Sequence, residues 1–486
     1  MASSATSPQR NCRLAPPRRL HHDELLVDEI LTRLPVAAAV RFRLVCRAWN
    51  KALTSDHFLK AHHARLAAAR QPELLFLLPP PAANGTAASL YACSLRDGEP
   101  PSAARELLTI GNLSSGEHVL ILSSPRPCHG LTLILDARHC FYYICNVSTR
   151  QHAALPPCEP AMCSPAGPSR IGMGFHLRPP PWTPFEISTA GLGFNHATGQ
   201  HKVVRLFKTR IGETICAVCA LGRPAGWRPC AGRVPPAAAS FIAGLPPVFI
   251  DGSLYWLLDN QLDTTGGQPP AIMSLSVDDE QFGFVRTPPL LSRRICHLTD
   301  LDGSLCATVD LRHVAERYAI FTWSGGGGST SWSVRCSINL QRLPRPIADE
   351  FVEEQDVVPL CSAGAGGNKK ILLATGRHKV FAYDPERDSM ERLVYMLEFV
   401  DIPRRHREAP LLLNISLHEE RIACVHDPTP SDCSSSSSKR RLHFRPGNKT
   451  LGKRQVPSND YHDDRFRHLR DLFKEMAGLP LPHMNI

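Results

Sequence analysis

The hydrophobic positions of residues 23–70 recur at the spacing of an α-helix. The first apolar stripe is spaced i, i+1, i+4, i+5 and i+8 and consists of Leu26, Val27, Ile30, Leu31 and Leu34. Asp23 is placed to cap the start of this helix. Pro35 ends the helix, because proline disfavours the α conformation at the residue before it.

Further helical stretches follow at once. One covers residues 36–44, the next carries Val45, Trp49 and Leu53 at i+4 steps, and the last, DHFLKAHHARLAAAR, begins at Asp56, which is placed to cap it. These segments predict a helical domain over residues 21–70. So small a unit buries too little surface to be robust alone, and we expect another protein to cover its remaining apolar side.

After Pro72 the pattern changes to short apolar runs broken by Gly, Pro, Asn and Asp, which is typical of many short strands. Two runs, FIDGSLYWLLD and LTDLDGSLCATVD, each place Asp-Gly between apolar segments. Asp-Gly suits a two-residue hairpin turn because its backbone tolerates positive φ at both positions. Asp251 and Asp302 of these hairpins are 51 residues apart.

A second kind of hairpin appears in ICNVSTRQHAAL, GFNHATGQHKVV and AYDPERDSMERL, where an apolar strand meets Asn or Asp and then a polar turn. Asn146 and Asn195 are 49 residues apart, and Asp384 follows 189 residues later, close to four such steps. A repeat of about 50 residues of antiparallel strand predicts a β-propeller of about six to eight blades over residues 72–430. An array of β-sandwiches is the alternative.

The remaining segments have simpler patterns. Residues 1–20 are rich in Ser, Pro and Arg, and we expect them to be disordered. Residues 431–460 form a Ser-rich basic linker, interpreted as a solvated loop or a nuclear-import signal. Residues 461–486 predict an amphipathic helix and tail, folded back onto the strand domain, with one apolar face: Phe466, Leu469, Leu472, Phe473 and Met476.

Composition is ordinary for a globular protein, at 43% hydrophobic and 21% charged residues. The net charge of +10 comes from scattered arginines that do not alternate with aromatic residues, so we do not expect nucleic-acid binding. The chain shows no secretory signal and no run of 18 apolar residues, and we expect no membrane contact. The predicted location is therefore the cytoplasm, the nucleus or both.

Candidate chemistry is sparse. The single C-x-x-C, Cys216 to Cys219, lies in the apolar run ETICAVCAL and reads as core thiols on a buried strand rather than zinc ligands. No Gly-rich phosphate loop, G-x-S-x-G or H-E-x-x-H occurs. Adjacent helical histidines such as His62-His63 point about 100° apart. The acidic run of residues 349–354 is interpreted as a solvated loop. We expect no catalytic residue, no metal site and no cofactor.

One segment carries a family likeness: DELLVDEILTRLPVAAAVRFRLVCRAWNKALTSDHFLKAH resembles the F-box. The resemblance implies docking to a Skp-type adaptor and, through it, to the cullin scaffold of a ubiquitin ligase. His21-His22 stand where the family has Leu-Pro, which we expect to weaken that docking. The residues expected to be shared between the small core and the adaptor interface are Leu26, Ile30, Leu34, Pro35, Val40, Val45 and Trp49.

The strand-rich remainder resembles the F-box-associated propeller-type domain of plants, through CHGLTLIL, GLGFNHATGQHKVVRLF, GWR and DGSLYWL in that order. The expected fold is thus α+β and multidomain, a three-helix F-box followed by an all-β, propeller-like domain. The implied function is a non-catalytic substrate receptor for a protein whose identity and binding residues the sequence leaves unknown. The alternative, favoured by His21-His22 and the basic residues 439–441, is a nuclear protein-interaction adaptor without ligase coupling.

Overall fold

A computed structural model of the chain divides into two compact units, Met1–Arg70 and Gln71–Ile486, which are described separately. The structure describes residues 29–69 and 73–454, except for gaps at 79–85, 96–100, 114–118, 122–124, 137–140, 160, 162, 165–184, 223–225, 260–270, 293, 326–330, 354–356, 365–368, 376–378, 400–414, 424 and 426–441. No helix in this part of the chain is long and apolar enough to cross a membrane.

The first unit is helical, with η2 (Leu31–Arg33), α2 (Val36–Phe42), α3 (Arg47–Leu53) and α4 (Asp56–Ala69). Pro35 separates η2 from α2, as predicted. The predicted third helix starts too early, because residues 43–45 form a turn and Cys46 accepts the Trp49 N–H as the N-cap of α3. The cap of α4 is also one residue earlier than predicted, since the Ser55 hydroxyl accepts from the Phe58 N–H.

Five fully or almost fully buried apolar side chains form the core of the helical unit: Leu31, Val36, Ala39, Leu53 and Phe58. Two polar contacts close it. His62 Nε2 donates to the Leu34 carbonyl at 2.8 Å, and Arg43 donates to the Leu53 carbonyl at 2.9 Å. The buried His62 therefore helps to hold the chain around Pro35, which is a structural role.

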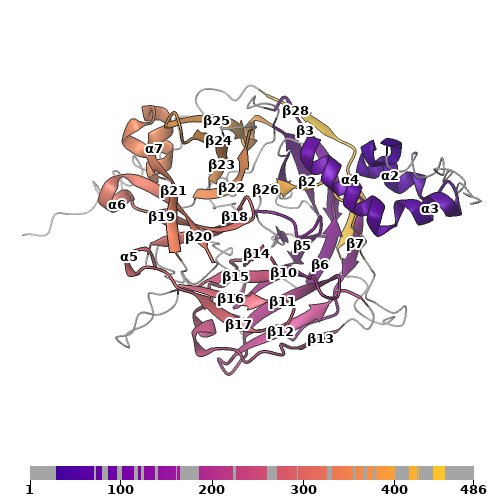
Figure 1. Cartoon of the computed structure of the whole chain (residues 1–486), viewed down its shortest axis with the longest axis horizontal. Helices are drawn as coiled ribbons and strands as arrows, with labels where there is room; N and C mark the ends of the chain where they lie inside the picture. Colours follow the sequence, from indigo (N-terminus) through magenta and orange to yellow (C-terminus); the bar gives the residue numbers. More distant parts are fainter. Residues whose placement is uncertain are drawn as a thin grey trace, which may run out of the picture. The chain divides into compact units, whose positions relative to one another are not determined.

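The second unit is built of six antiparallel sheets arranged around a common centre (Figure 1). The first strands of successive sheets pack against one another, β10 with β14, β14 with β18 and β18 with β22. This confirms the propeller and the predicted blade range, with six blades, and the sandwich array is wrong. Five sheets follow chain order: β4 (Val119–Ile121), β5 (Thr132–Asp136), β6 (Phe141–Asn146), β7 (Gln151–Ala154); β10 (Ser188–Asn195), β11 (Gln200–Lys208), β12 (Thr214–Ala220), β13 (Trp227–Pro229); β14 (Val248–Ile250), β15 (Ser253–Leu257), β16 (Ile272–Ser276), β17 (Phe282–Val285); β18 (Ile295–Leu301), β19 (Ser304–Asp310), β20 (Arg317–Ser324), β21 (Ser331–Asn339); β22 (Val357–Ala363), β23 (Lys370–Thr375), β24 (Lys379–Asp384), β25 (Ser389–Tyr395).

The sixth sheet joins the two ends of the unit. Its order is β26-β1-β2-β3-β27, with β28 also paired to β3. The strands are β1 (Glu73–Leu78), β2 (Ala87–Ser94), β3 (Ala103–Gly111), β26 (Ile415–His418), β27 (His443–Pro446) and β28 (Thr450–Gly452). β26 thus supplies the inner strand of a blade whose other strands come from the start of the unit. The blade packs against its neighbour through a buried cluster that includes Leu74, Phe76, Leu360, Leu372 and Ala382.

β27 and β28 correct the predicted linker over residues 431–460. Residues 443–446 and 450–452 are strands rather than linker, because the outer edge of β3 offers unpaired backbone groups that they satisfy. The strand domain therefore extends beyond residue 430. The Ser-rich residues 431–441, the predicted helix and tail over 461–486, and the N-terminal residues 1–20 lie outside the described residues.

Both kinds of hairpin form as predicted. Asp251 and Gly252 have φ of 44° and 75°, and Asp302 and Gly303 have φ of 56° and 78°, each pair joining the first two strands of its blade. Asn146, however, ends the third strand of a blade, whereas Asn195 ends the first strand of the next. Their spacing is therefore not a blade repeat. Of the three spacings used to predict the repeat (Asp251 to Asp302, Asn146 to Asn195, and Asn195 to Asp384), only the first compares equivalent positions.

The remaining elements are short. They include the two-stranded pair β8 (Cys163–Ser164) and β9 (Phe185–Glu186), the 3-10 turns η3 (Pro236–Ser240), η5 (Leu340–Arg342) and η6 (Met396–Glu398), and the helices α5 (Pro289–Ser292), α6 (Arg312–Ala315) and α7 (Arg345–Glu353). The acidic loop predicted over residues 349–354 is wrong for 349–353, which belong to α7. Glu350 there pairs with Lys379 at 2.8 Å, which ties the helix to β24.

Candidate functional site

The helical unit exposes large apolar side chains around its first turns. Ile30 is 56% exposed, Val45 61% and Leu44 87%. Leu44 was missed from sequence because the predicted helix over 36–44 did not reveal the turn that projects it. Several large apolar side chains exposed in so small a unit are typical of a surface that another protein covers.

Six of the seven residues predicted for the adaptor interface lie in the described part of this unit, and none belongs to its fully buried core. Leu26 lies outside the described residues. Ile30, Pro35 and Val45 are exposed, while Leu34, Val40 and Trp49 are half-buried. The Trp49 ring meets Phe42 edge-on, at 5.4 Å between centroids. The core positions are different residues, so the predicted set is available at the surface.

The propeller unit holds a pocket of about 430 Å³, within the usual range for ligand pockets. Its walls come from residues 125–129, Leu192 of β10 and residues 247–251, which include all of β14. Charged side chains stand among them: Arg126, Asp251, Asp300, Glu419 and Arg421. The strands that supply these residues belong to different blades, so only the closed ring assembles the pocket.

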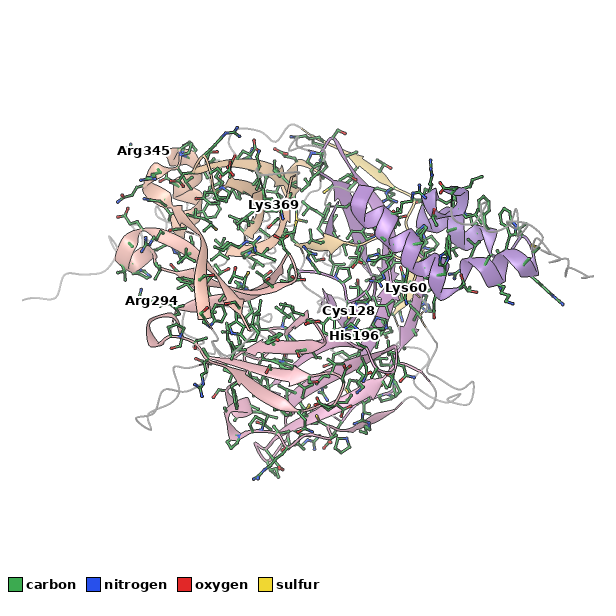
Figure 2. All side chains as sticks on the ribbon, in the orientation of Figure 1. Lys60, Cys128, His196, Arg294, Arg345 and Lys369 are labelled. Carbon is green, nitrogen blue, oxygen red and sulfur yellow. The ribbon has the colours of Figure 1, made fainter. Side chains whose placement is uncertain are left out.

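A tight turn over residues 128–131 shapes one side of this pocket. Cys128 and Leu131 exchange two backbone hydrogen bonds, of 2.9 and 3.0 Å, around His129 (φ 49°) and Gly130 (φ 80°). A β-carbon on Gly130 would lie 2.6 Å from the Arg421 β-carbon, so this position requires glycine. Cys128 and His196, labelled in Figure 2, come from neighbouring blades and lie beside each other in that view.

Aromatic rings extend from this turn into the next blade. His129 packs on Phe194 with 4.3 Å between ring centroids, and Phe194 in turn contacts His196 and His201. Burial lowers the pKa of His201 to about 4, so its ring is neutral at physiological pH. Among the described residues, no three His, Cys, Asp or Glu side chains are grouped so as to hold a metal ion.

Each arginine of the pocket stands near a carboxylate. Arg126 Nε lies 4.0 Å from Asp300 Oδ2, and Arg421 Nη1 lies 3.6 Å from Glu419 Oε1. Burial raises the pKa of the Glu419 carboxyl, and the two arginines oppose that rise. Asp251 makes no ion pair with any residue that the structure describes.

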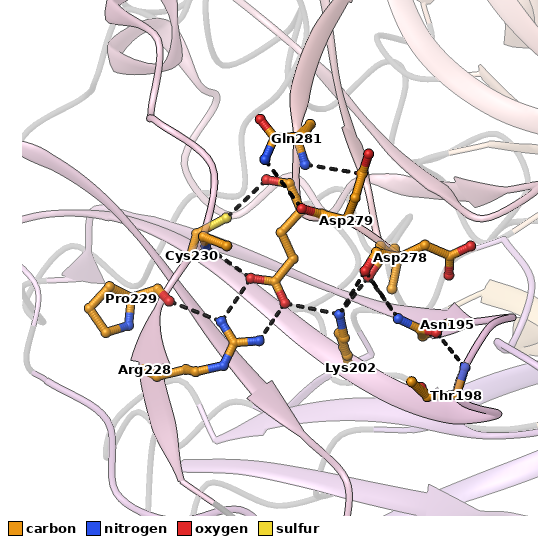
Figure 3. A network of polar contacts seen from close by, with 12 residues as sticks. Asn195, Thr198, Lys202, Arg228, Pro229, Cys230, Asp278, Asp279 and Gln281 are labelled. Atoms are coloured by element: carbon orange, nitrogen blue, oxygen red, sulfur yellow. Dashed lines mark hydrogen bonds and ion pairs between the residues drawn. The ribbon is translucent and has the colours of Figure 1, made fainter.

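A second polar cluster, centred on Glu280, is fully satisfied by its neighbours (Figure 3). Glu280 accepts from Lys202 Nζ at 2.9 Å, from both terminal nitrogens of Arg228 and from the Ala231 N–H at 3.0 Å. Although burial raises the pKa of Glu280, these donors together bring it down to about 2. Lys202 and Arg228 belong to one blade and Glu280 to the next, so the cluster ties the two together.

The cysteines of the described strands are free thiols with the character of core residues. Burial raises the pKa of Cys93, Cys145 and Cys361 to about 12, which keeps them protonated and unreactive. Cys216 and Cys219 lie on the buried strand predicted for them and belong to two different core clusters. They face opposite sides of β12 and are not a zinc-binding pair.

Comparison with known proteins gives two family matches. A model of the F-box domain matches residues 20–61, and a model of the F-box associated beta propeller domain matches residues 99–409. The F-box/LRR-repeat protein At2g43260 of Arabidopsis thaliana is 24% identical over 325 residues, 65% of this chain and 66% of that protein. The F-box protein At3g07870 of the same plant is 23% identical over 393 residues, 76% of this chain and 87% of that protein.

The chain therefore spans just under two thirds of the length of the first of these relatives. Among solved structures, a chain of the nidogen/laminin complex covers 72% of this chain and is itself covered completely, at 11% identity. The TM-score of that match is 0.37.

Proposed function

The chain belongs to the F-box-associated β-propeller family, and on this premise we propose that it is the substrate-recognition subunit of a Skp-cullin-F-box ubiquitin ligase. The helical unit docks to a Skp-type adaptor, the adaptor binds the cullin scaffold, and a separate enzyme of the complex delivers ubiquitin. The propeller holds a protein substrate within reach of that enzyme. The chain itself carries out no chemistry and acts by proximity and orientation.

The exposure of Ile30, Leu44 and Val45 is the observation that supports this proposal most directly. All three lie inside the segment matched by the F-box model. Moving one such side chain out of water is worth about 1.5–3 kcal/mol, so a partner that covers all three gains substantial binding free energy. Leu34, Pro35, Val40 and Trp49 lie in the same unit and complete the proposed interface.

The propeller supports the second half of the proposal as a rigid platform. Its six blades close into a ring through β26, and the edge strand β3 is covered by β27 and β28. Loops held by such a scaffold are suited to recognising another protein, because the scaffold fixes their positions before binding.

Adaptor capture by the full-length chain tests the proposal. Val45→Asp places a charge on an exposed position, so the unit should stay folded while recovery of a purified Skp-type adaptor falls at least about tenfold. Ile211→Asp is the matched control, since Ile211 is an aliphatic residue 86% exposed in the propeller unit, and it should leave recovery unchanged.

Unchanged recovery with Val45→Asp would reject this docking surface. If the unsubstituted chain captures no adaptor and is found in the nucleus, the alternative of a nuclear protein-interaction adaptor without ligase coupling replaces the proposal.

A further inference from the structure

We propose that the 430 Å³ pocket of the propeller receives a lysine or arginine side chain of the protein substrate, with Asp251 as the carboxylate that binds its charge. This inference rests on the proposed function, because it assigns the substrate-anchoring site and the class of side chain that fills it.

The size and walls of the pocket fit a long side chain with an apolar stem. About 430 Å³ is at the lower end of the range for ligand pockets, which suits a single side chain and its flanking backbone rather than a folded element. Pro125, Leu192, Pro247 and Val248 line the pocket and offer apolar surface. Lysine and arginine cover apolar surface with their methylene stems while their charged heads reach polar groups.

The charges of the pocket leave one carboxylate in excess. Its three carboxylates are Asp251, Asp300 and Glu419, and its two guanidinium groups are Arg126 and Arg421. Each arginine stands beside one carboxylate, Arg126 near Asp300 and Arg421 near Glu419. Asp251 is the member left without an ion pair among the described residues, and it is exposed, so its carboxylate is accessible to a cation from outside.

The surroundings of Asp251 favour a cation over a neutral hydrogen-bond donor. Phe249 of β14, two residues before the turn residue Asp251, also lines the pocket, and its ring centroid lies 6.3 Å from that of His129. Aromatic rings attract ammonium and guanidinium groups through the π face, so a ring in the same pocket adds to the attraction of the carboxylate. The turn fixes the Asp251 backbone in the left-handed region at φ 44°, which sets the point from which its exposed side chain extends.

Asp251→Asn tests the role of the carboxylate charge, because asparagine adopts the left-handed conformation at least as well as aspartate and removes only the charge. The matched control is Asp302→Asn, the same substitution in the equivalent Asp-Gly turn of the next blade. Asp302 does not line the pocket, and its carboxylate is already paired with Arg335.

The probe is a set of fluorescent decapeptide pools, each random except for one central residue: lysine, arginine, acetyl-lysine, citrulline, glutamate or phosphoserine. Their affinity for the full-length chain is measured by fluorescence polarisation. We expect the lysine and arginine pools to bind about tenfold more tightly than their neutral isosteres. Asp251→Asn should remove that difference and Asp302→Asn should keep it. The chain carries a net charge of +10, so unspecific attraction favours the acidic pools and cannot imitate this result.

Two results would overturn the inference. Preferential binding of the glutamate or phosphoserine pools would assign the pocket to anions held by Arg126 and Arg421. A lysine and arginine preference that survives Asp251→Asn would place the recognition elsewhere. Adaptor capture, measured on the same Asp251→Asn protein, should equal that of the unsubstituted chain, so failure of the docking proposal and failure of this one are distinguishable.

Discussion

Glu73 and His418, 345 positions apart in the chain, stand directly opposite each other on β1 and β26, and their side chains are hydrogen-bonded. Glu73 also accepts from Ser94 of β2 at 3.1 Å and from Arg105 of β3 at 3.3 Å. His418 Nε2 lies 3.2 Å from the hydroxyl of Ser148 in the next blade. One carboxylate therefore links β1, on which it lies, to β2, β3 and β26 of the closing sheet.

The contact between Glu73 and His418 predicts that acid weakens the sheet that closes the propeller ring. Burial raises the pKa of the Glu73 carboxyl, but His418 and Arg105 outweigh it and bring the pKa from 4.5 to about 2. A carboxyl with a lowered folded-state pKa stabilises the fold fully above the unfolded pKa, and the contribution disappears as pH falls from 4.5 towards 2. It amounts to at most about 3 kcal/mol. Glu73→Gln should lose this amount at pH 7 in urea unfolding, and the difference from the unsubstituted chain should shrink below pH 4.5. Equal stability at pH 7 would contradict the role of the pair.

The Glu280 cluster predicts a large effect of removing one buried charge. Glu280→Gln leaves Lys202, whose side chain is only 9% exposed, without its ionic partner. The expected loss is about 3–5 kcal/mol of unfolding free energy. The double variant Lys202→Met, Glu280→Gln should recover part of that loss, because it removes the unpaired charge as well. Denaturant unfolding of both variants measures this. If the double variant is less stable than Glu280→Gln alone, the unpaired charge of Lys202 is not the cause of the loss.

The hairpin residues Asn146 and Asp384 predict unequal responses when an amide and a carboxylate are exchanged. Asn146 accepts from the Ser148 and Thr149 N–H groups and also donates to the carbonyls of Arg421 and Ala423. Asn146→Asp cannot donate and turns an oxygen towards two carbonyls, at a cost of about 2–4 kcal/mol.

Asp384, at the same place in its own blade, accepts from the N–H groups of Glu386 and Arg387. Asp384→Asn keeps this acceptor, so it should shift the thermal midpoint far less than Asn146→Asp. Thermal unfolding followed by circular dichroism compares the two, and equal shifts would refute the assignment.

In the helical unit, substitutions of a buried and of a half-buried aromatic residue should separate the stability of the unit from its binding to the adaptor. Phe58 is fully buried, and Phe58→Ala should cost about 3–5 kcal/mol and open the unit to proteolysis. Trp49 is half-buried against Phe42, so Trp49→Ala should cost clearly less. It should nevertheless reduce adaptor capture. Limited proteolysis between residues 30 and 70 reports the first effect and adaptor recovery the second. The interpretation fails if Trp49→Ala opens the unit as readily as Phe58→Ala.

Local signals predicted the local structure well. The Asp-Gly turns at Asp251 and Asp302 form because positive φ at two successive residues is a property of those residues themselves. Pro35 likewise marks a helix boundary on its own. Leu44 and Val45 show the limit of this reasoning, since helical spacing continued through a turn that only the folded chain reveals.

Long-range pairing was not readable from the sequence. The sequence ISLH at residues 415–418 does not indicate that it pairs with β1, because many short apolar strands of the chain have the same alternating pattern. The strands β27 and β28 were hidden in a basic segment, since an edge strand that faces solvent needs few apolar residues. The pocket followed the same rule: its charged residues come from segments nearly 300 positions apart and meet only in the closed ring.

The inner strand of the closing blade is also the last of the inner strands to leave the ribosome. Until residue 418 has been synthesised, β1 has no partner on its inner side. The nascent ring therefore exposes an unpaired strand edge, which favours aggregation or chaperone binding. A premature stop codon anywhere before β26 would therefore release an unsealed product, however complete the other five blades are.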